Sequence, residues 1–455
     1  MLINFRLLNF LSFDTLNEFS LVKGKSRRHP EHLYKYKDVQ LLKFSAIYGA
    51  NGAGKSNLIK AFKFSKDFIS NNNFPESSTQ SYCRTKKKNK DLETSFEYEI
   101  IIDNKMYSYG FSILLSKKII KKEWLYEITN STENAIFTLD FENNDLLLDI
   151  DKLISNTNDK ERLKIYINDF KSLSKSDCSL FLHFINKGKS SFDKKHAARI
   201  LNLVYRWFSN KLEVISPSDT TNRGLTYLDE NDDSIENFLK DFGTGINSIK
   251  ITPISLDEMY KLESAEFIDF INDDINKHID AIKKHKSNVD IDITAIMRTS
   301  KNLFSIKKIA SQDIEYNVIK FTHYADNETY KLSEESDGTI RLLELYDVIK
   351  NKQDKIFIID ELDRSLHPNL TYNFVKMFLS LKNKSQLIVS THEDRILDLN
   401  IMRRDEIWFV EKNDIGESKL YSLEQFKTRF DKDVMNAYLD GRYGSIPKFK
   451  FLNNY

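Results

Sequence analysis

The chain has 455 residues, of which 40% are hydrophobic and 12% aromatic, so it can bury enough surface to fold as about two or three domains. Its 68 lysines and arginines balance 67 aspartates and glutamates, and this net charge of +1 excludes a general electrostatic attraction to nucleic acid or anionic lipid. The two cysteines, Cys83 and Cys178, are too few for a disulfide framework or a zinc site of their own, which favours a reducing compartment.

The N-terminal segment, residues 1–13, alternates like a strand and has no basic segment followed by an apolar run and a cleavage site. No stretch of the chain approaches the roughly 20 apolar residues that a membrane helix needs. We therefore expect a soluble, cytoplasmic protein with no membrane partner.

The first part of the chain is expected to be rich in strands. Ile3, Phe5 and Leu7 alternate with polar residues, residues 42–48 predict a second strand, and a helix is expected from Lys55. Three further strands, with a turn at residues 103–105, predict an antiparallel meander: residues 96–102, 106–114 and 119–128.

Residues 129–312 are more polar, and we expect them to form a mainly helical insertion. Apolar residues there fall on one helical face, but no heptad pattern is sustained, which argues against a long coiled coil. The residues of that face are Ile200, Leu201, Val204, Trp207 and Phe208.

From Ile314 onward strands and helices alternate again, with apolar strands at residues 356–359 and 387–389 and a helix at 370–381. The two ends therefore predict one split α/β domain, with residues 1–128 as its N-terminal part and 313–455 as its C-terminal part.

Residues 49–56 read Gly-Ala-Asn-Gly-Ala-Gly-Lys-Ser and match the P-loop pattern at every fixed position, between a strand at 44–48 and a helix. Glycines let the backbone N–H groups point at phosphate oxygens, and the helix adds its positive end. Lys55 is expected to meet the β- and γ-phosphates of ATP, and Ser56 to bind Mg²⁺. The predicted nucleotide-binding residues are Gly49, Asn51, Gly52, Gly54, Lys55, Ser56 and Asn57.

Two carboxylates, Asp360 and Glu361, follow the apolar strand at residues 356–359. This pattern places Asp360 at the edge of the sheet beside the phosphates, where we expect it to bind Mg²⁺. Glu361 is then placed to polarise the attacking water. A third apolar strand ends at His392, which we expect to contact the γ-phosphate and, with Glu361 and Lys55, to serve catalysis.

A polar turn at residues 332–338 precedes an amphipathic helix. Ser336 and Gly338 would place a hydroxyl and backbone N–H groups at the start of this helix, which is a second anion site. The chain's own P-loop already supplies one phosphate cradle. A second cradle is therefore expected to serve the nucleotide of a neighbouring protomer.

The motifs follow one another in a set order: the P-loop, residues 336–339, the acid pair, the turn at 365–368 and His392. This order resembles that of the ABC-type ATPases, which include the SMC and OLD-like proteins. Three segments are most similar to OLD-like ATPases of bacterial abortive-infection systems: Glu-Ser-Asp-Gly-Thr at 335–339, residues 405–410 and the tail 440–447. That group includes the ATPase subunit of PARIS-type phage defence.

The resemblance implies a split ABC-type P-loop ATPase head with an antiparallel β lobe and a helical insertion. It implies that residues 336–339 close on the partner's ATP in a head-to-tail dimer or higher homo-oligomer, and that residues 365–367 form the D-loop. The usual signature sequence Leu-Ser-Gly-Gly-Gln is absent. Gln80 is the only candidate for the Q-loop glutamine, so the sequence leaves open when metal binding is coupled to closure of the dimer.

The resemblance implies a sensor or regulatory ATPase that acts with a separate toxic effector, a Toprim-type nuclease, in a response to a phage-derived trigger. The 63 residues after His392 (455 less 392) are too few for a Toprim domain, so we expect the toxic chemistry in another protein. The alternatives are an SMC-like ATPase of DNA repair, which would need heptads and a basic groove, and a nuclease-associated OLD-type ATPase acting on DNA. A transporter subunit is disfavoured by the size of the insertion, and nucleic-acid binding stays open.

One dense basic run stands apart from these motifs. It is either a solvated loop or a contact for a polyanion or a partner protein. Its residues are Arg84, Lys86, Lys87, Lys88 and Lys90.

Overall fold

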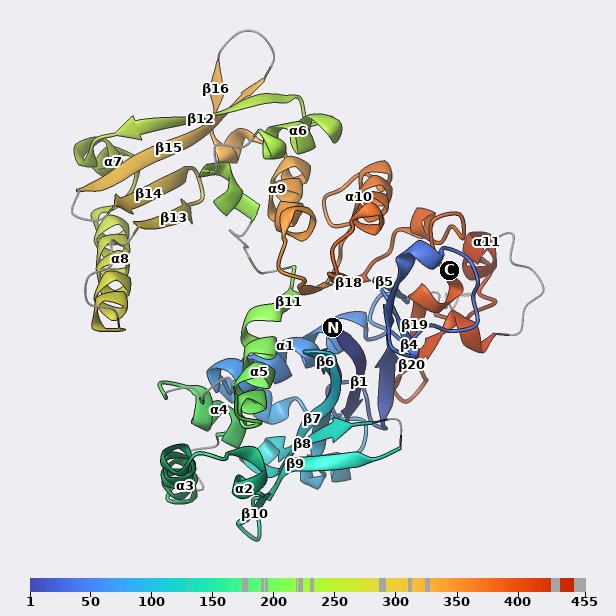
Figure 1. Ribbon diagram of the computed structural model, residues 1–455. Helices are drawn as coiled ribbons and strands as arrows, with labels where there is room; N and C mark the ends of the chain where they lie inside the picture. Colours follow the sequence, from blue (N-terminus) through green and yellow to red (C-terminus); the bar gives the residue numbers. More distant parts are fainter. Residues whose placement is uncertain are drawn as a thin grey trace. The chain divides into compact units, whose positions relative to one another are not determined.

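A computed structural model gives the structure of the chain, and Figure 1 shows its helices and strands. The residues that it describes are 1–129, 131–173, 179–189, 192, 195–217, 219, 224–229, 233–285, 292–309, 313–323, 328–426 and 434–445. Cys178, Ile446 and Pro447 lie outside the described residues. The chain divides into two compact units, Met1–Pro217 with Lys352–Asp363 and Thr371–Tyr455, and Ser218–Asn351 with Arg364–Leu370.

The first unit contains an antiparallel sheet of seven strands in the order β10-β9-β8-β7-β6-β1-β2. The predicted meander is confirmed as β6, β7 and β8, which pair in antiparallel register. Asp103 and Asn104 both have left-handed backbones, with φ of 46° and 59°, as a two-residue hairpin turn requires. The strands are β1 (Leu2–Leu8), β2 (Asn17–Ser20), β6 (Thr94–Ile102), β7 (Lys105–Leu114), β8 (Ile119–Ile128), β9 (Glu133–Asp140) and β10 (Asp145–Leu148).

The same unit contains a six-stranded sheet in the order β11-β17-β18-β5-β19-β20. Its first five strands are parallel, and β20 runs antiparallel to β19. Strand β5 comes from the start of the chain and lies between β18 and β19 from its end, which confirms the split α/β domain. The strands are β5 (Phe44–Tyr48), β11 (Leu212–Ile215), β17 (Ile356–Ile359), β18 (Gln386–Ser390), β19 (Ile407–Lys412) and β20 (Ser418–Ser422).

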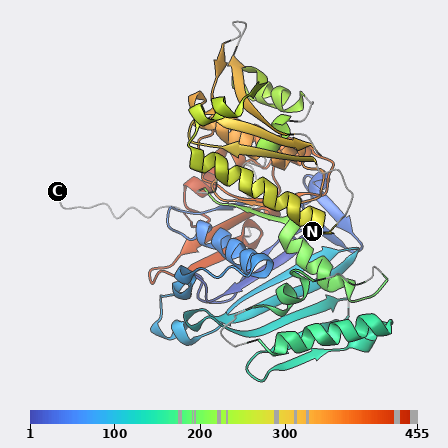
Figure 2. The ribbon, with the colours of Figure 1, turned by 90° about the vertical axis from the view of Figure 1, so that its left-hand side faces the viewer.

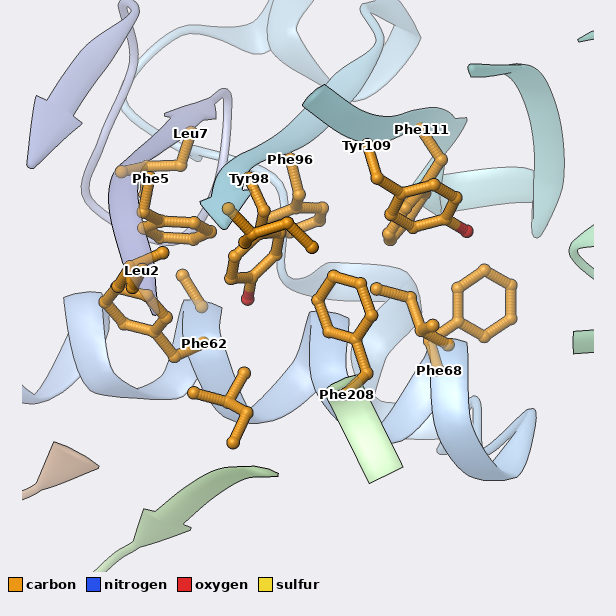
Figure 3. Packing of buried hydrophobic residues seen from close by; sticks show 14 of the residues in the cluster. Leu2, Phe5, Leu7, Phe62, Phe68, Phe96, Tyr98, Tyr109, Phe111 and Phe208 are labelled. Carbon is orange, nitrogen blue, oxygen red and sulfur yellow. The ribbon is translucent and has the colours of Figure 1, made fainter. Parts of the chain in front are cut away.

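Helix α1 (Lys55–Asn71) follows β5 and packs against the antiparallel sheet. Figure 3 shows Phe62 and Phe68 of this helix pointing toward Phe5, Tyr98 and Phe111 of the strands. The rings of Phe5 and Phe62 stack with their centroids 3.9 Å apart, and Phe68 lies 5.5 Å from Phe111. Burial of these large rings anchors the helix whose first turn belongs to the P-loop.

Residues 129–312 contain helices together with strands that we did not expect. Strands β9 and β10 continue the antiparallel sheet, and β11 joins the six-stranded sheet. The predicted apolar face at residues 200–208 is confirmed, since its five residues are buried on α5 and the π-helical turn at Trp207–Lys211. The helices of this interval in the first unit are α2 (Ile150–Leu153), α3 (Thr157–Lys171), α4 (Phe181–Asn186) and α5 (Arg199–Arg206).

The second unit has its own sheet, in which β12, β15, β14 and β13 are neighbours and β16 also pairs with β15. Figure 2 shows α8 running along this sheet, and Ile268 and Ile271 of α8 pack against Phe304 and Val318. The strands are β12 (Ile246–Ile254), β13 (Asp292–Arg298), β14 (Leu303–Ile309), β15 (Ile314–His323) and β16 (Thr329–Tyr330). The helices are α6 (Ser234–Asp241), α7 (Leu256–Leu262), α8 (Ala265–His285) and α9 (Asp337–Lys350).

The remaining elements are short or follow the six-stranded sheet. A hairpin of β3 (Leu33–Tyr36) and β4 (Val39–Leu42) precedes β5, α10 (Pro368–Ser380) lies between β17 and β18 in the chain, and α11 is Val434–Leu439. Helix α10 confirms the helix expected at residues 370–381. Within the described part of the chain, no helix has the length and apolarity to cross a membrane.

Candidate functional site

Three predicted motifs meet at one edge of the six-stranded sheet. Strands β5, β18 and β17 are parallel neighbours in that order, and each is followed at its carboxyl end by one motif. The P-loop follows β5, His392 follows β18 and Asp360 follows β17. Because the carboxyl ends of parallel strands share one edge of a sheet, the fold brings the three motifs together.

The P-loop leaves the first turn of α1 open to an anion. Gly54 occupies the N-cap position, no side chain caps the helix, and its first turn contains no acidic residue. The first N–H groups of a helix have no partner within the helix, and its positive end favours phosphate. Ser56, the second residue of the helix, adds a hydroxyl group to this turn. This donor set fits the phosphates of a nucleotide.

At two positions of the loop, close neighbours leave no space for a side chain larger than that of glycine. A Cβ at Gly49 would lie 2.5 Å from the carbonyl oxygen of Val410, and a Cβ at Gly54 would lie 2.4 Å from Ser418 Oγ. Gly54 also has a φ of 122°, which L side chains rarely adopt. Gly52 differs, because its φ is 75° but a Cβ there would meet nothing within 4 Å.

Ser12 and Ser418 support the P-loop, and no sequence motif indicated these two serines. Ser418 Oγ donates to the carbonyl of Ala53 at 2.5 Å and lies 2.7 Å from Ser12 Oγ. Asn57, predicted to bind nucleotide, donates its side-chain amide to Ser12 Oγ at 2.8 Å. Asn51 is exposed at the tip of the loop.

Lys55 and His392 are in direct contact. Lys55 Nζ donates to the carbonyl of Gly49 at 2.6 Å and lies 3.0 Å from His392 Nε2. Burial lowers the pKa of Lys55 to about 8, partly offset by the carboxylates of Asp360, Asp363 and Glu361. Burial, together with the Lys55 ammonium, also lowers the pKa of His392, so the ring is neutral at pH 7 and accepts a hydrogen bond from Lys55.

The acid pair is fixed by Ser390 at the end of β18. The Ser390 hydroxyl donates to Asp360 Oδ1, and the N–H of Glu361 donates to Ser390 Oγ at 2.9 Å. Asp360 is buried, and its N–H donates to the carbonyl of Ile215 on β11. Glu361 has a left-handed backbone with φ of 52°, a conformation that costs free energy in a non-glycine residue and is found often at functional sites.

Asp363 is a site residue that the sequence reasoning missed. Its Oδ1 accepts the Thr391 hydroxyl at 2.7 Å and the N–H of His392 at 3.2 Å. The carboxylate thus holds the backbone that presents the His392 ring to Lys55. An acidic residue three positions after Asp360 was the available sequence signal, but its partner lies 29 positions further along the chain.

Ser336 and Gly338 lie in the second unit, at the start of α9. Ser336 is the N-cap, and its Oγ accepts the N–H of Thr339 at 3.1 Å. A Cβ at Gly338 would lie 2.9 Å from the carbonyl oxygen of Ser365, whose own φ is 61°. The turn at 365–367 therefore packs directly on the start of the α9 helix.

The other predicted features are placed as follows. Gln80, the Q-loop candidate, is exposed at the end of a 3-10 helix formed by Glu76–Gln80. In the basic run, Lys86 forms ion pairs with Asp14 at 2.6 Å and Glu417 at 2.7 Å. Part of that run is thus engaged with acidic neighbours within the same unit.

The parallel sheet, the loop at the start of α1 and the acid pair two strands away define a P-loop ATPase domain of mixed α/β fold. The chain belongs to the family described as "AAA domain, putative AbiEii toxin, Type IV TA system", which matches residues 44–398.

Comparisons with whole proteins give weaker similarities. No curated protein matches the chain. Among solved structures, an SMC head bound to the C-winged helix domain of ScpA has a TM-score of 0.43 and 14% identity, covering 92% of this chain and 97% of that one. The SMC head domain from Thermotoga maritima has a TM-score of 0.37 and 12% identity, covering 92% and 98%. An Smc head domain with an extended coiled coil from Pyrococcus furiosus has a TM-score of 0.34 and 15% identity, covering 97% and 99%.

Proposed function

We propose that this protein binds ATP with Mg²⁺ at the P-loop and hydrolyses it to ADP and phosphate. The observation that carries the proposal is the uncapped start of α1 beside the Lys55 ammonium, which contacts a neutral His392 and lies near three carboxylates. The backbone N–H groups of Gly49 to Ser56 and the Lys55 ammonium would bind the phosphates. An ATPase needs these groups at the position where the phosphates of ATP bind.

The residues around the reacting phosphate have separate roles. Ser56 and Asp360 would hold Mg²⁺, which neutralises phosphate charge when it is bound. Glu361 would orient and polarise the attacking water, and its backbone is held by Ser390. His392 would exchange its contact with Lys55 for one with the γ-phosphate, positioned by Asp363.

The site is completed by a second copy of the chain. Ser336, Gly338 and the helix start that they form would close on the ATP held by the partner's P-loop in a head-to-tail dimer or higher homo-oligomer. The support is that the 14-residue helix α9 begins with the Ser336 hydroxyl and has a glycine at its second position, while α1 already provides the phosphate cradle of this chain.

The cellular role that we propose is that of a sensor or regulatory subunit for a separate toxic effector, a Toprim-type nuclease, in antiphage defence. The toxin named in the family description supports a link to abortive infection. Residues 129–312 or the basic run would provide the docking surface. ATP closure can move a bound effector only if the two proteins make different contacts in the open and closed states.

The first experiment separates ATP binding from ATP hydrolysis. Lys55→Ala should lose nucleotide binding, because it removes the cation that meets the phosphates. Glu361→Gln should bind ATP normally but hydrolyse it about 10²–10⁴ times more slowly, because it removes the base that activates water. Glu76→Gln is the matched control, since this carboxylate is exposed, pairs with Lys118 and belongs to neither the P-loop nor the acid pair. ATP hydrolysis by Glu361→Gln at the wild-type rate would refute the assignment.

A further inference from the structure

A cluster of metal-ligand residues lies outside the P-loop motifs, in the segment that leads to β3. One donor atom from each of His29, Glu31 and His32 lies within 4.8 Å of the other two. Glu31 Oε1 is 3.0 Å from His29 Nδ1 and 3.8 Å from His32 Nε2. The three donor atoms therefore form one compact cluster.

The backbone of this segment holds the two rings side by side. His29 has a left-handed backbone, with φ of 48°, and Pro30 begins a short 3-10 helix, Pro30–His32. The imidazole rings stack with their centroids 4.8 Å apart and their planes 12° apart. One nitrogen of each ring, His29 Nδ1 and His32 Nε2, lies on the side of the Glu31 carboxylate.

The outer nitrogens are both held by acceptors. His29 Nε2 lies 3.1 Å from the carbonyl oxygen of Leu399, and His32 Nδ1 lies 3.1 Å from Glu406 Oε1. Glu406 is fully buried, and its other oxygen accepts the N–H of Arg403 at 2.8 Å. Histidines that bind metal ions commonly donate their second N–H to a carboxylate or a carbonyl in this way, which fixes the tautomer.

A neutral imidazole has one N–H, yet each of these rings faces an acceptor on both sides. With the outer N–H groups used by Leu399 and Glu406, the inner nitrogens present lone pairs toward the Glu31 carboxylate. In that tautomer two imidazole nitrogens and a carboxylate lie close together without a proton between them, and a cation bound by all three would remove their repulsion.

We propose that His29, Glu31 and His32 bind one Zn²⁺ ion, with water in the fourth position. Two imidazole nitrogens and one carboxylate oxygen are a zinc donor set, and zinc ligands at about 2.0–2.2 Å are separated from each other by about 3.3 Å in a tetrahedron. The two separations from Glu31, 3.0 and 3.8 Å, lie on either side of that value, and all three donor atoms lie within 4.8 Å of one another. Mg²⁺ prefers oxygen ligands, so the metal of the nucleotide site would not compete here.

The bound ion would act as a structural clamp. His29 and His32 reach Leu399 and Glu406, which lie in the connection between β18 and β19. The connection begins at the His392 motif. Zn²⁺ at this point would therefore fasten the segment before β3 to the loop that follows the γ-phosphate contact.

Metal binding by the full-length, nucleotide-free protein tests the proposal. Zn²⁺ affinity is measured by competition with a chelator, stoichiometry by elemental analysis, and coordination by the visible spectrum of Co²⁺ in place of zinc. The wild type should bind one Zn²⁺ per chain and give a tetrahedral Co²⁺ spectrum. Glu31→Gln and His29→Asn should each weaken Zn²⁺ binding at least about 10- to 100-fold and remove that spectrum.

His196→Asn is the matched control, because His196 pairs with the single carboxylate of Asp159 at 3.2 Å. It should leave Zn²⁺ affinity unchanged. His32 is left in place, since its removal would leave buried Glu406 without this partner. Glu31 is largely exposed, so Glu31→Gln should fold, which circular dichroism checks. Zn²⁺ affinity that is undiminished in either ligand variant, or no Zn²⁺ bound by the wild type, would overturn the proposal.

Discussion

At the scale of single residues, the candidate site depends on a buried lysine whose charge is costly before nucleotide binds. Lys55 Nζ donates to the carbonyls of Gly49 and Ala50 and contacts a neutral His392, and burial lowers the pKa of the lysine to about 8. Phosphate oxygens would supply the negative charge that this ammonium lacks. Binding should therefore raise the pKa of Lys55 and couple nucleotide affinity to pH.

The pH dependence of nucleotide binding follows with a definite sign. Above pH 8 the free protein loses the Lys55 proton, while the phosphate-bound form keeps it, so binding takes up a proton. ATP affinity, measured without Mg²⁺ to prevent turnover, should fall as pH rises above 8, by up to about tenfold per pH unit. Calorimetry at pH 8.5 in two buffers of different ionisation enthalpy measures the proton uptake directly. Lys55→Arg keeps its charge at this pH and should show no uptake; equal affinity of the wild type at pH 7 and 9.5 would contradict the argument.

At the scale of elements, the P-loop is shaped by strands that come from the far end of the chain. Val410 on β19 and Ser418 on β20 approach Gly49 and Gly54 so closely that a Cβ would collide with them. The start of α1 is thus held between the loop's own backbone and the last two strands of the sheet. Loop geometry and sheet assembly are therefore coupled.

A glycine comparison within the loop tests this coupling. Gly54→Ala should lower thermal stability and abolish nucleotide binding, because it adds a contact of 2.4 Å with Ser418 to a backbone with φ of 122°. Strained backbones of this kind cost about 1–3 kcal/mol, before any collision is counted. Gly52→Ala is the control, with a φ of 75° and open space, and should cost only about 1–2 kcal/mol. Unfolding midpoints that are equal for the two variants would argue against the role assigned to Ser418.

The elements nearest the P-loop could be predicted from local sequence. Strand β5, the start of α1 at Lys55 and the turn at Asp103 and Asn104 each have a pattern within a few residues, and each is confirmed. Residues 42–48, however, do not form one strand, because β4 ends at Leu42 and β5 begins at Phe44.

The parts that were missed depend on long-range pairing. Strand β11 has four residues, and its partner β17 lies more than 140 positions later. The sequence predicts helix over the interval that contains β12, because the alternation of Ile249 and Ile251 is short and lies among polar residues. Asp363 and Ser418 likewise act on the site through residues far away in the chain. Local periodicity carries no information on such contacts.

At the scale of the whole molecule, we propose an ATP switch that acts on another protein. If the switch holds or releases a separate effector, association with that effector should change between the nucleotide-free and ATP-bound forms. Pull-down of Glu361→Gln with the products of neighbouring genes, with and without ATP, measures this change. Nucleic-acid degradation by the ATPase alone, or phage protection in cells that lack the neighbouring genes, would contradict a separate effector.

The most direct test of the shared site measures ATP turnover in two purified heterodimers, isolated with a different affinity tag on each protomer. In the first, a Lys55→Ala protomer is paired with a Ser336→Arg protomer. If each site combines the P-loop of one chain with Ser336 of the other, one site is intact, and up to about half of the wild-type turnover should return. In the second, a protomer with both changes is paired with wild type, so both shared sites are damaged and turnover should be lost. The opposite result, an inactive first heterodimer and an active second one, would show that each chain contains its whole site and would contradict the proposal.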